Sequence, residues 1–195
     1  RFGRLMYMGT PVATSAVKTH RTNTIGLGLK LNPRPDIEYL GITQEEATEW
    51  ARTVRREFSL WASHKEACDT LGINDFYELQ QLLLTSWLTS GDVFVLVQQG
   101  KATPYRPYTL RLRALEADLV TTPSAAGAIA GTSGINPNNG NRIFDGIEVD
   151  RNGAVVAYHI TNHYPYESTV TPYETKRIPA YGRKTGLPNV LHLNR

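Results

Sequence analysis

The sequence predicts an α+β fold in which N-terminal helices pack on a mainly antiparallel β-sheet. Between residues 43 and 90, apolar residues recur at helical spacing, and from residue 93 onward they follow the period of two that is typical of strands. We therefore interpret residues 1–195 as a single domain. Residues 1–90 form its mainly helical half and residues 91–195 its mainly β half.

The composition is that of an ordinary globular protein. Hydrophobic residues make up 41% and charged residues 20%, and no apolar run approaches the roughly 18 residues of a membrane span. We expect no membrane association, and the opening residues lack the apolar centre of a signal peptide. The single cysteine, Cys68, excludes an internal disulfide, which fits an intracellular setting. The net charge of +3 is compatible with a nucleic-acid or acidic partner, although no block of basic residues occurs.

The first elements are a short helix and a strand. Thr10-Pro11 resembles an N-cap followed by a first-turn proline, so we expect a helix from Val12 to about His20. Residues 24–31 then alternate with period two and predict a strand. Its inward residues are Ile25, Leu27, Leu29 and Leu31.

Two longer helices follow. Thr43 and Glu46 have the spacing of a capping box and begin the first helix. The second helix begins at Asn74 or Asp75 and ends at Gly91. Apolar residues at helical spacing predict that both helices contribute to the core. These predicted core residues are Trp50, Val54, Phe58, Trp61, Leu79 and Leu83.

The second half alternates strands with loops. Residues 93–98 and 109–115 predict strands, and in the second one leucines and an alanine oppose Arg111 and Arg113. Residues 121–143 are rich in glycine, alanine, serine and asparagine, which predicts a long mobile loop. Residues 163–182 have the character of an edge strand or loop, and a last strand begins at Val190.

Residues 144–160 predict a β-hairpin. Asn152-Gly153 can take the positive φ angles of a type I′ turn, which pairs Val149 with Val156 and Ile147 with Tyr158. A turn one residue earlier places Val149 opposite Val155 and exposes Tyr158, so we favour the first register. Val149, Val156 and Tyr158 are then core residues. The opposite face has no assigned role and carries Glu148, Asp150, Ala157 and His159.

No motif indicates catalysis. The glycines at 26 and 28 lack the remainder of a phosphate-binding loop. His159 and His163 stand four apart in a β-patterned segment, too far to share a metal ion. Cys68 and His64 have no evident third group to orient them. We therefore expect a non-enzymatic protein without a metal or cofactor.

Two arginine faces are candidate contacts for DNA or a neighbouring subunit. Arg52, Arg55 and Arg56 share a helix face, whereas Arg111 and Arg113 share a strand face. Either face can bind phosphates or an acidic surface, and a solvated face is the simpler interpretation. The pattern supplies no exposed aromatics between the arginines to stack the bases of a single strand.

Several segments, in this order, resemble the portal proteins of lambda-type tailed bacteriophages. Together they span nearly the whole chain, and the resemblance lies in their order and spacing rather than in any catalytic signature. The segments are Ser15-Ala16-Val17 through THRTNTIGLGLKL, EEATEWARTVRREFSLWA, ACDTLG, FYELQQLLLTSWLTSGDVFVLV, LRLRALEADLV and DGIEVDRNGAVVAYHI.

The resemblance implies a structural subunit of a homo-oligomeric ring, typically a dodecamer at one capsid vertex of a phage or prophage. Such rings nucleate assembly in the host cytoplasm, dock the terminase large subunit, bind capsid and head-completion proteins, and pass double-stranded DNA. This chain is similar to the N-terminal wing portion, without the family's stem, clip and crown. The alternative is a nucleic-acid-binding module that acts as a monomer or dimer.

Overall fold

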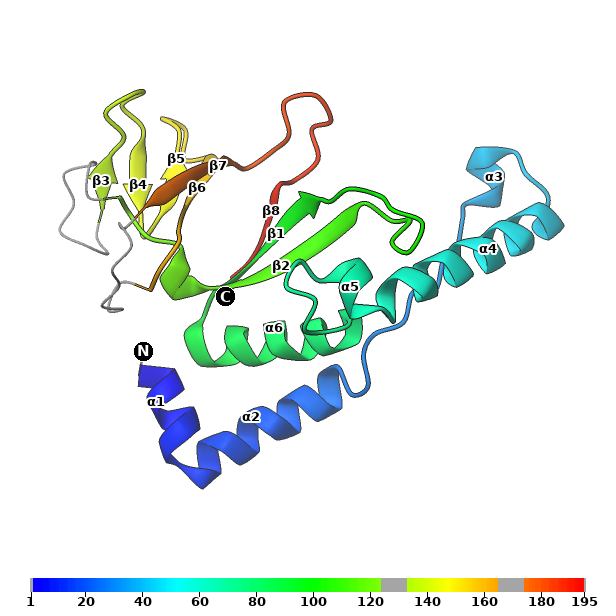
Figure 1. Ribbon diagram of the computed structural model, residues 1–195, viewed down its shortest axis with the longest axis horizontal. Coiled ribbons are helices and arrows are strands. Elements are labelled where there is room, and N and C mark those ends of the chain that lie inside the picture. Colours follow the sequence, from blue (N-terminus) through cyan, green and yellow to red (C-terminus); the bar gives the residue numbers. More distant parts are fainter. Residues whose placement is uncertain (1, 124–132, 165–173, 195) are drawn as a thin grey trace. The chain divides into compact units, whose positions relative to one another are not determined.

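A computed structural model describes residues 2–123, 133–164 and 174–194. It confirms the α+β class, because the described α-helices precede residue 91 and the strands follow it (Figure 1). The helices are α1 (Phe2–Gly9), α2 (Pro11–Thr24), α3 (Ile37–Leu40), α4 (Gln44–Ala62), α5 (Lys65–Cys68) and α6 (Phe76–Ser90), with the 3₁₀ turn η1 (Ala117–Leu119). The strands are β1 (Val93–Gln99), β2 (Leu110–Glu116), β3 (Gly134–Ile135), β4 (Arg142–Phe144), β5 (Ile147–Val149), β6 (Val155–Thr161), β7 (Thr175–Pro179) and β8 (Val190–Leu193).

The chain divides into two compact units. The first contains residues 1–4, 86–97 and 114–195, and the second contains residues 5–85 and 98–113. The first unit thus includes the end of α6 and the start of α1, and the second includes the end of β1 and the start of β2. This division does not coincide with a boundary at residue 90.

Helices α4 and α6 begin where their capping residues predict. The Thr43 hydroxyl accepts a hydrogen bond from the Glu46 N–H at 3.2 Å, and the Glu46 carboxylate accepts one from the Thr43 N–H at 2.8 Å. Asp75 and Glu78 make the same reciprocal pair, at 2.8 and 3.0 Å, at the start of α6. Gly91, with φ of 94°, follows the end of that helix.

An aromatic cluster forms the core between α4 and α6 in the second unit. Phe58, Trp61 and Phe76 have ring centroids 5.2 to 5.5 Å apart. Trp61 is buried, and its indole N–H donates to the carbonyl of Leu110 at 3.0 Å. The other predicted core residues of these helices are buried at Leu79 and half-buried at Val54, Phe58 and Leu83.

The prediction of a buried Trp50 is wrong. Its side chain is 51% exposed, although it continues the apolar stripe of α4. The reason is that the C-terminal turns of α4 meet the aromatic cluster, whereas the turn that carries Trp50 lies away from it. Periodicity identifies a helix face, but it does not show how much of that face is covered.

The strand predicted for residues 24–31 is also wrong. Helix α2 extends to Thr24, and Gly26 and Gly28 then take positive φ angles of 56° and 107°, which a strand does not contain. The side-chain amide of Gln80 instead satisfies both backbone groups of Leu29, at 2.7 and 3.2 Å. Leu27, expected to point inward, is 92% exposed.

The first unit contains a five-stranded antiparallel sheet in the order β3-β4-β5-β6-β7 (Figure 1). Strand β7 lies at its edge, as the sequence predicted for this region, and residues 165–173 lie outside the described residues. A second sheet has the order β2-β1-β8, and β8 begins at Val190 as expected. The core cluster consists of Phe94, Leu96, Leu115, Val120, Tyr158, Ala180 and Val190.

The predicted hairpin register is correct at its base and wrong at its tip. Ile147 pairs with Tyr158, which is buried. Val149, however, pairs with Val155 and not with Val156, because a bulge lies between residues 148 and 149. Val149 and Val156 are half-buried. The bulge therefore combines the two registers that the sequence left as alternatives.

The type I′ turn expected at Asn152-Gly153 is wrong. Gly153 has φ of 86°, but Asn152 is not among the described residues with positive φ. The Asp150 carboxylate accepts hydrogen bonds from the N–H groups of Asn152 and Ala154, both at 2.8 Å, and this supports a different turn. Two successive positive φ angles, 45° and 81°, occur instead at Asp145-Gly146 between β4 and β5.

The long mobile loop predicted for residues 121–143 is wrong in its described parts. Thr121 and Thr122 are buried, and residues 134–144 contain the paired strands β3 and β4. The asparagines of this segment make turns and hydrogen bonds that the composition alone does not reveal. Residues 124–132 of the predicted loop lie outside the described residues.

Candidate functional site

A buried carboxylate gathers polar side chains inside the first unit. Glu148 of β5 is fully buried, and Arg177 of β7 donates to it from Nε at 2.7 Å and from a terminal nitrogen at 2.9 Å. His159 of β6 lies 3.0 Å from it through Nε2. Three side-chain amides of the β3–β4 connection complete this group, which we call the Glu148 cluster. They belong to Asn136, Asn139 and Asn141, at 3.1, 2.7 and 2.9 Å.

The Glu148 cluster keeps its carboxylate charged. Burial raises the pKa of Glu148, but hydrogen bonds outweigh burial, the one from Arg177 most strongly, and hold the pKa well below its usual range. Both carboxylate oxygens accept several donors, so no free lone pair remains to take a proton from a substrate. The arrangement therefore suits a structural role, in which the Glu148 carboxylate joins the β3–β4 connection to strands β5, β6 and β7.

The sequence placed Glu148 and His159 on one face but assigned that face no role. Two further parts of the cluster were missed, namely Arg177 and the asparagines of residues 136–141. A usable signal was present, because a glutamate at a buried strand position requires donors, and residues 136–141 are rich in side-chain amides.

Cys68 does not form a reactive pair with His64. The thiol is buried, and burial, followed by the nearby Asp69 and Asp75 carboxylates, raises its pKa to about 11. The ring of His64 instead lies 2.7 Å from the carbonyl of Leu60. Across residues 2–123, 133–164 and 174–194, no group of three or more histidine, cysteine, aspartate or glutamate side chains could hold a metal ion.

The arginine face expected on β2 is not an exposed surface. Arg111 is buried, and one of its terminal nitrogens donates to the carbonyls of Ala67, Tyr108 and Leu110, so its assignment as a DNA or subunit contact is wrong. Arg113 is half-buried. The predicted alternation of inward leucines with outward arginines is wrong, since Leu110 is 40% exposed and Leu112, Arg113 and Ala114 are all half-buried.

The arginines of α4 remain exposed. Arg52 pairs with Glu49 at 2.6 Å, and Arg56 pairs with Glu57 at 3.1 Å. Arg55 lies 3.5 Å from the side chain of Asn32. Two of the three guanidinium groups thus have an acidic neighbour on their own helix, which lowers the net positive charge that this face offers to phosphates.

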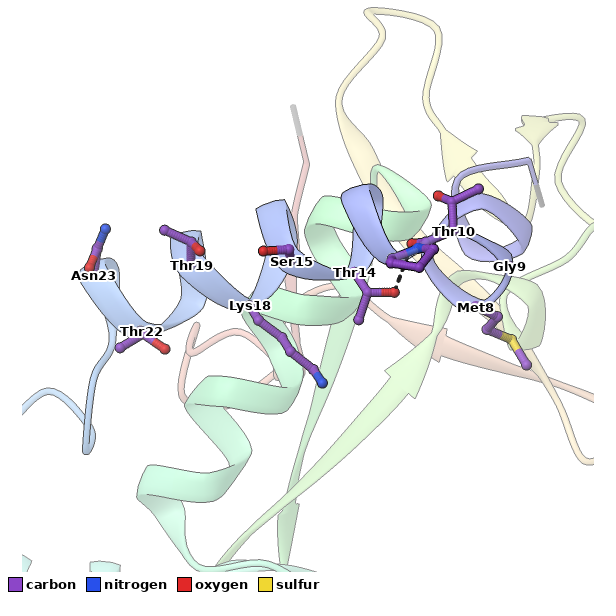
Figure 2. Close-up of a pocket in the computed structure, with 10 residues that line it drawn as sticks. Met8, Gly9, Thr10, Thr14, Ser15, Lys18, Thr19, Thr22 and Asn23 are labelled. Atoms are coloured by element: carbon purple, nitrogen blue, oxygen red, sulfur yellow. Dashed lines mark hydrogen bonds between the residues drawn. The ribbon is translucent and has the colours of Figure 1, made fainter.

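Helices α1 and α2 form an exposed part of the described chain. Neither helix has a buried residue, and large apolar side chains are exposed at Leu5 (67%), Met8 (82%) and Val12 (82%). A shallow hollow runs along these helices (Figure 2), and its lining includes Met8, Lys18 and short polar side chains. The sequence predicted a short helix here without a role.

The distribution of charge along the chain also distinguishes this surface. Residues 1–35 contain six basic residues and no acidic residue. Residues 36–195 contain the other fifteen basic residues and all eighteen acidic ones, which gives them a net charge of −3. The excess positive charge of the chain therefore lies at its N-terminal end.

None of the helices in the described part of the chain has both the length and the apolar character that a membrane crossing requires. A family model described as phage portal protein, lambda family, matches residues 4–195, which is nearly the entire chain. The match includes both compact units and every described strand. The chain therefore belongs to the lambda family of phage portal proteins, whose role in the phage is structural.

Proposed function

We propose that this chain is a subunit of a homo-oligomeric portal ring, a dodecamer at one vertex of the capsid. Double-stranded DNA is packaged and ejected through this ring. The family match over residues 4–195 carries the proposal. It is supported by α1 and α2, which expose large apolar side chains and bury none, as expected of elements that another subunit covers.

The proposed role extends to the partners of such a ring. The subunit assembles in the host cytoplasm, nucleates the capsid, and docks the terminase large subunit and later the head-completion proteins. The function rests on contacts between proteins, without a catalytic step or a cofactor. The raised pKa of Cys68 and the full hydrogen bonding of Glu148 agree with this, since neither group is available as a nucleophile or base.

The exposed arginines of α4 and the half-buried Arg113 are proposed contacts for DNA or a neighbouring subunit. DNA that moves through a ring needs weak contacts that do not depend on base sequence. Arg52 and Arg56 are already paired with Glu49 and Glu57, so we expect them to bind phosphates weakly, as such contacts require. A separate nucleic-acid-binding module is less well supported, because Arg111 is occupied by backbone carbonyls.

Native mass spectrometry and negative-stain imaging of the natural protein test this proposal. A closed ring of identical subunits is the expected result. A protein that stays monomeric at all concentrations and binds DNA in a salt-sensitive manner would refute it and favour the nucleic-acid-binding module. Measuring DNA affinity at several salt concentrations separates the two outcomes, because each phosphate contact steepens the salt dependence.

A further inference from the structure

Helix α2 lacks the packing that normally stabilises a helix of its length. It has 14 residues, of which four are threonines and two are valines, residue types with low helix propensity. An isolated helix of about this length is marginal in water, and helices in proteins owe most of their stability to packing of one face. The described part of this chain buries no residue of α2 and so does not supply the full surface that would stabilise it.

The segment that carries α2 is nevertheless tied down at both ends. Before it, Arg4 donates to the Ser90 hydroxyl at 2.7 Å and pairs with Glu116 and Asp118, each at 2.8 Å. After it, the side-chain amide of Gln81 donates to the carbonyl of Gly26 at 2.9 Å. We call residues 5–25, between these two attachments, the N-terminal arm. The chain thus has side-chain contacts on each side of the arm, at Arg4 within the first unit and at Gly26 within the second, while the arm itself buries no residue.

The chemistry of the N-terminal arm favours a protein partner with an acidic surface. Leu5 and Met8 lie three positions apart on α1, and Val12 follows at the start of α2, all well exposed. Apolar side chains gain stability from a protein surface and not from a phosphate backbone. The arm also has Lys18 and Arg21 and no acidic residue, whereas residues 36–195 of the same chain carry a net charge of −3.

We propose that the N-terminal arm docks on the next copy of this chain and holds neighbouring subunits together. The inference rests on the proposed ring function and identifies one of the surfaces that build the ring. The exposed apolar side chains of the arm pack on the neighbour, and its basic residues face the acidic remainder of that chain. The contact is head-to-tail, with the arm of one copy on a different surface of the next, as ring closure requires.

Cysteine labelling tests whether the arm is covered in the assembly. Cys68 has no exposed surface, so an introduced cysteine is the accessible one. Val12→Cys reports on the arm, and Leu187→Cys is a matched control, because Leu187 is 66% exposed and lies outside the arm. On assembly, we expect maleimide labelling at position 12 to slow by about tenfold or more, while labelling at position 187 is unchanged. Equal rates at position 12 in monomer and assembly would overturn the inference.

A double substitution tests whether the arm stabilises the assembly. Met8→Glu combined with Val12→Glu is expected to raise the protein concentration needed for assembly by about tenfold or more, and Leu187→Glu leaves it unchanged. Because these side chains are exposed, circular dichroism of the monomer stays the same. If the double variant assembles at the same protein concentration as the wild type, the inference is overturned. If it does so but binds double-stranded DNA more weakly, the arm contacts phosphates and not a neighbouring subunit.

The two proposals fail in different ways. If the wild-type protein never assembles, the ring function is refuted and the docking of the arm is refuted with it. If the wild-type protein forms a ring in which position 12 stays fully reactive, the ring function stands and only the inference about the arm is overturned.

Discussion

Replacement of Glu148 by glutamine tests whether the buried carboxylate holds the five-stranded sheet together. The substitution keeps the size of the side chain but removes its charge and converts one oxygen to an NH₂ group. One oxygen accepts hydrogen bonds from Asn139, Asn141 and Arg177, and the other from Asn136, Arg177 and His159. In either orientation, the new NH₂ group therefore faces donors in place of acceptors. A changed His159 tautomer relieves at most one of these clashes.

The expected loss of stability is large because the site is buried. Hydrogen bonds to a charged group each contribute about 1.5–3 kcal/mol, and removal of one member of a buried ion pair costs about 3–5 kcal/mol. These contributions are not additive, and the Arg177 side chain is 39% exposed, so water screens part of its attraction. We expect Glu148→Gln to lower the free energy of unfolding of the first unit by about 3–5 kcal/mol.

Amide hydrogen exchange on peptides from β5 and β6 measures this quantity locally, which matters in a chain with two compact units. Glu49→Gln is the matched control, because that carboxylate is 62% exposed and pairs with Arg52 on the surface of α4. Its effect should stay below about 1 kcal/mol. If the two substitutions change the free energy of unfolding equally, the structural role assigned to Glu148 is refuted.

The difference in the free energy of unfolding between wild type and Glu148→Gln should decrease as the pH falls. The folded-state pKa of Glu148 lies below its usual range, and in the unfolded chain it is about 4.3. The carboxylate therefore contributes its full stabilisation above about pH 4.3 and loses it as the pH falls toward the folded-state pKa, because the unfolded chain binds the proton first. The stability difference between wild type and Glu148→Gln should narrow between pH 7 and pH 3. A constant difference would contradict the assigned charge state.

Three further predictions concern other elements. Trp61→Ala should lower the free energy of unfolding by about 3–5 kcal/mol, and Trp50→Ala by less than about 1 kcal/mol. The reason is burial, since the Trp61 side chain is 6% exposed and the Trp50 side chain 51%. Equal shifts of the two variants in thermal unfolding would contradict this. In urea unfolding, Gly146→Ala should destabilise the protein more than Gly153→Ala does. Both glycines have positive φ, but only at Gly146 would the added methyl group lie 2.4 Å from a backbone nitrogen. The reverse order would rule out this close approach. At pH 8, Cys68 should react with a thiol reagent much more slowly in the folded protein than in the urea-unfolded protein, because burial raises its pKa to about 11. Equal rates would show that the thiol is not buried.

The helix boundaries show what the sequence alone determines well. The capping pairs Thr43–Glu46 and Asp75–Glu78 and the end of α6 before Gly91 depend on groups within a few positions of each other. Such interactions form wherever the helix is placed in the fold, so the local sequence is sufficient. The start of the last strand at Val190 was also predicted, from the short run Val190-Leu191-His192-Leu193.

Turn chemistry was only partly predictable. Both Asp145-Gly146 and Asn152-Gly153 permit two positive φ angles, and the structure uses that conformation at the first. At the second site the Asp150 side chain supports a different turn, and a bulge at Val156 of β6, opposite Glu148 and Val149, shifts the pairing by one residue. Several turns are nearly equal in energy locally, and strand pairing on both sides selects among them.

By itself, the sequence determined the α+β class, the starts of α4 and α6, the end of α6, the base of the hairpin and, through the order of its segments, the portal family. Only the tertiary structure decided which faces are covered, as at Trp50 and Arg111, and which distant residues meet. Glu148 finds donors as far away as Asn136 and Arg177 because β5 lies in the sheet beside β4 and β6, with β7 one strand further along. Such contacts depend on strand order, a long-range property that short-range periodicity and propensity do not encode.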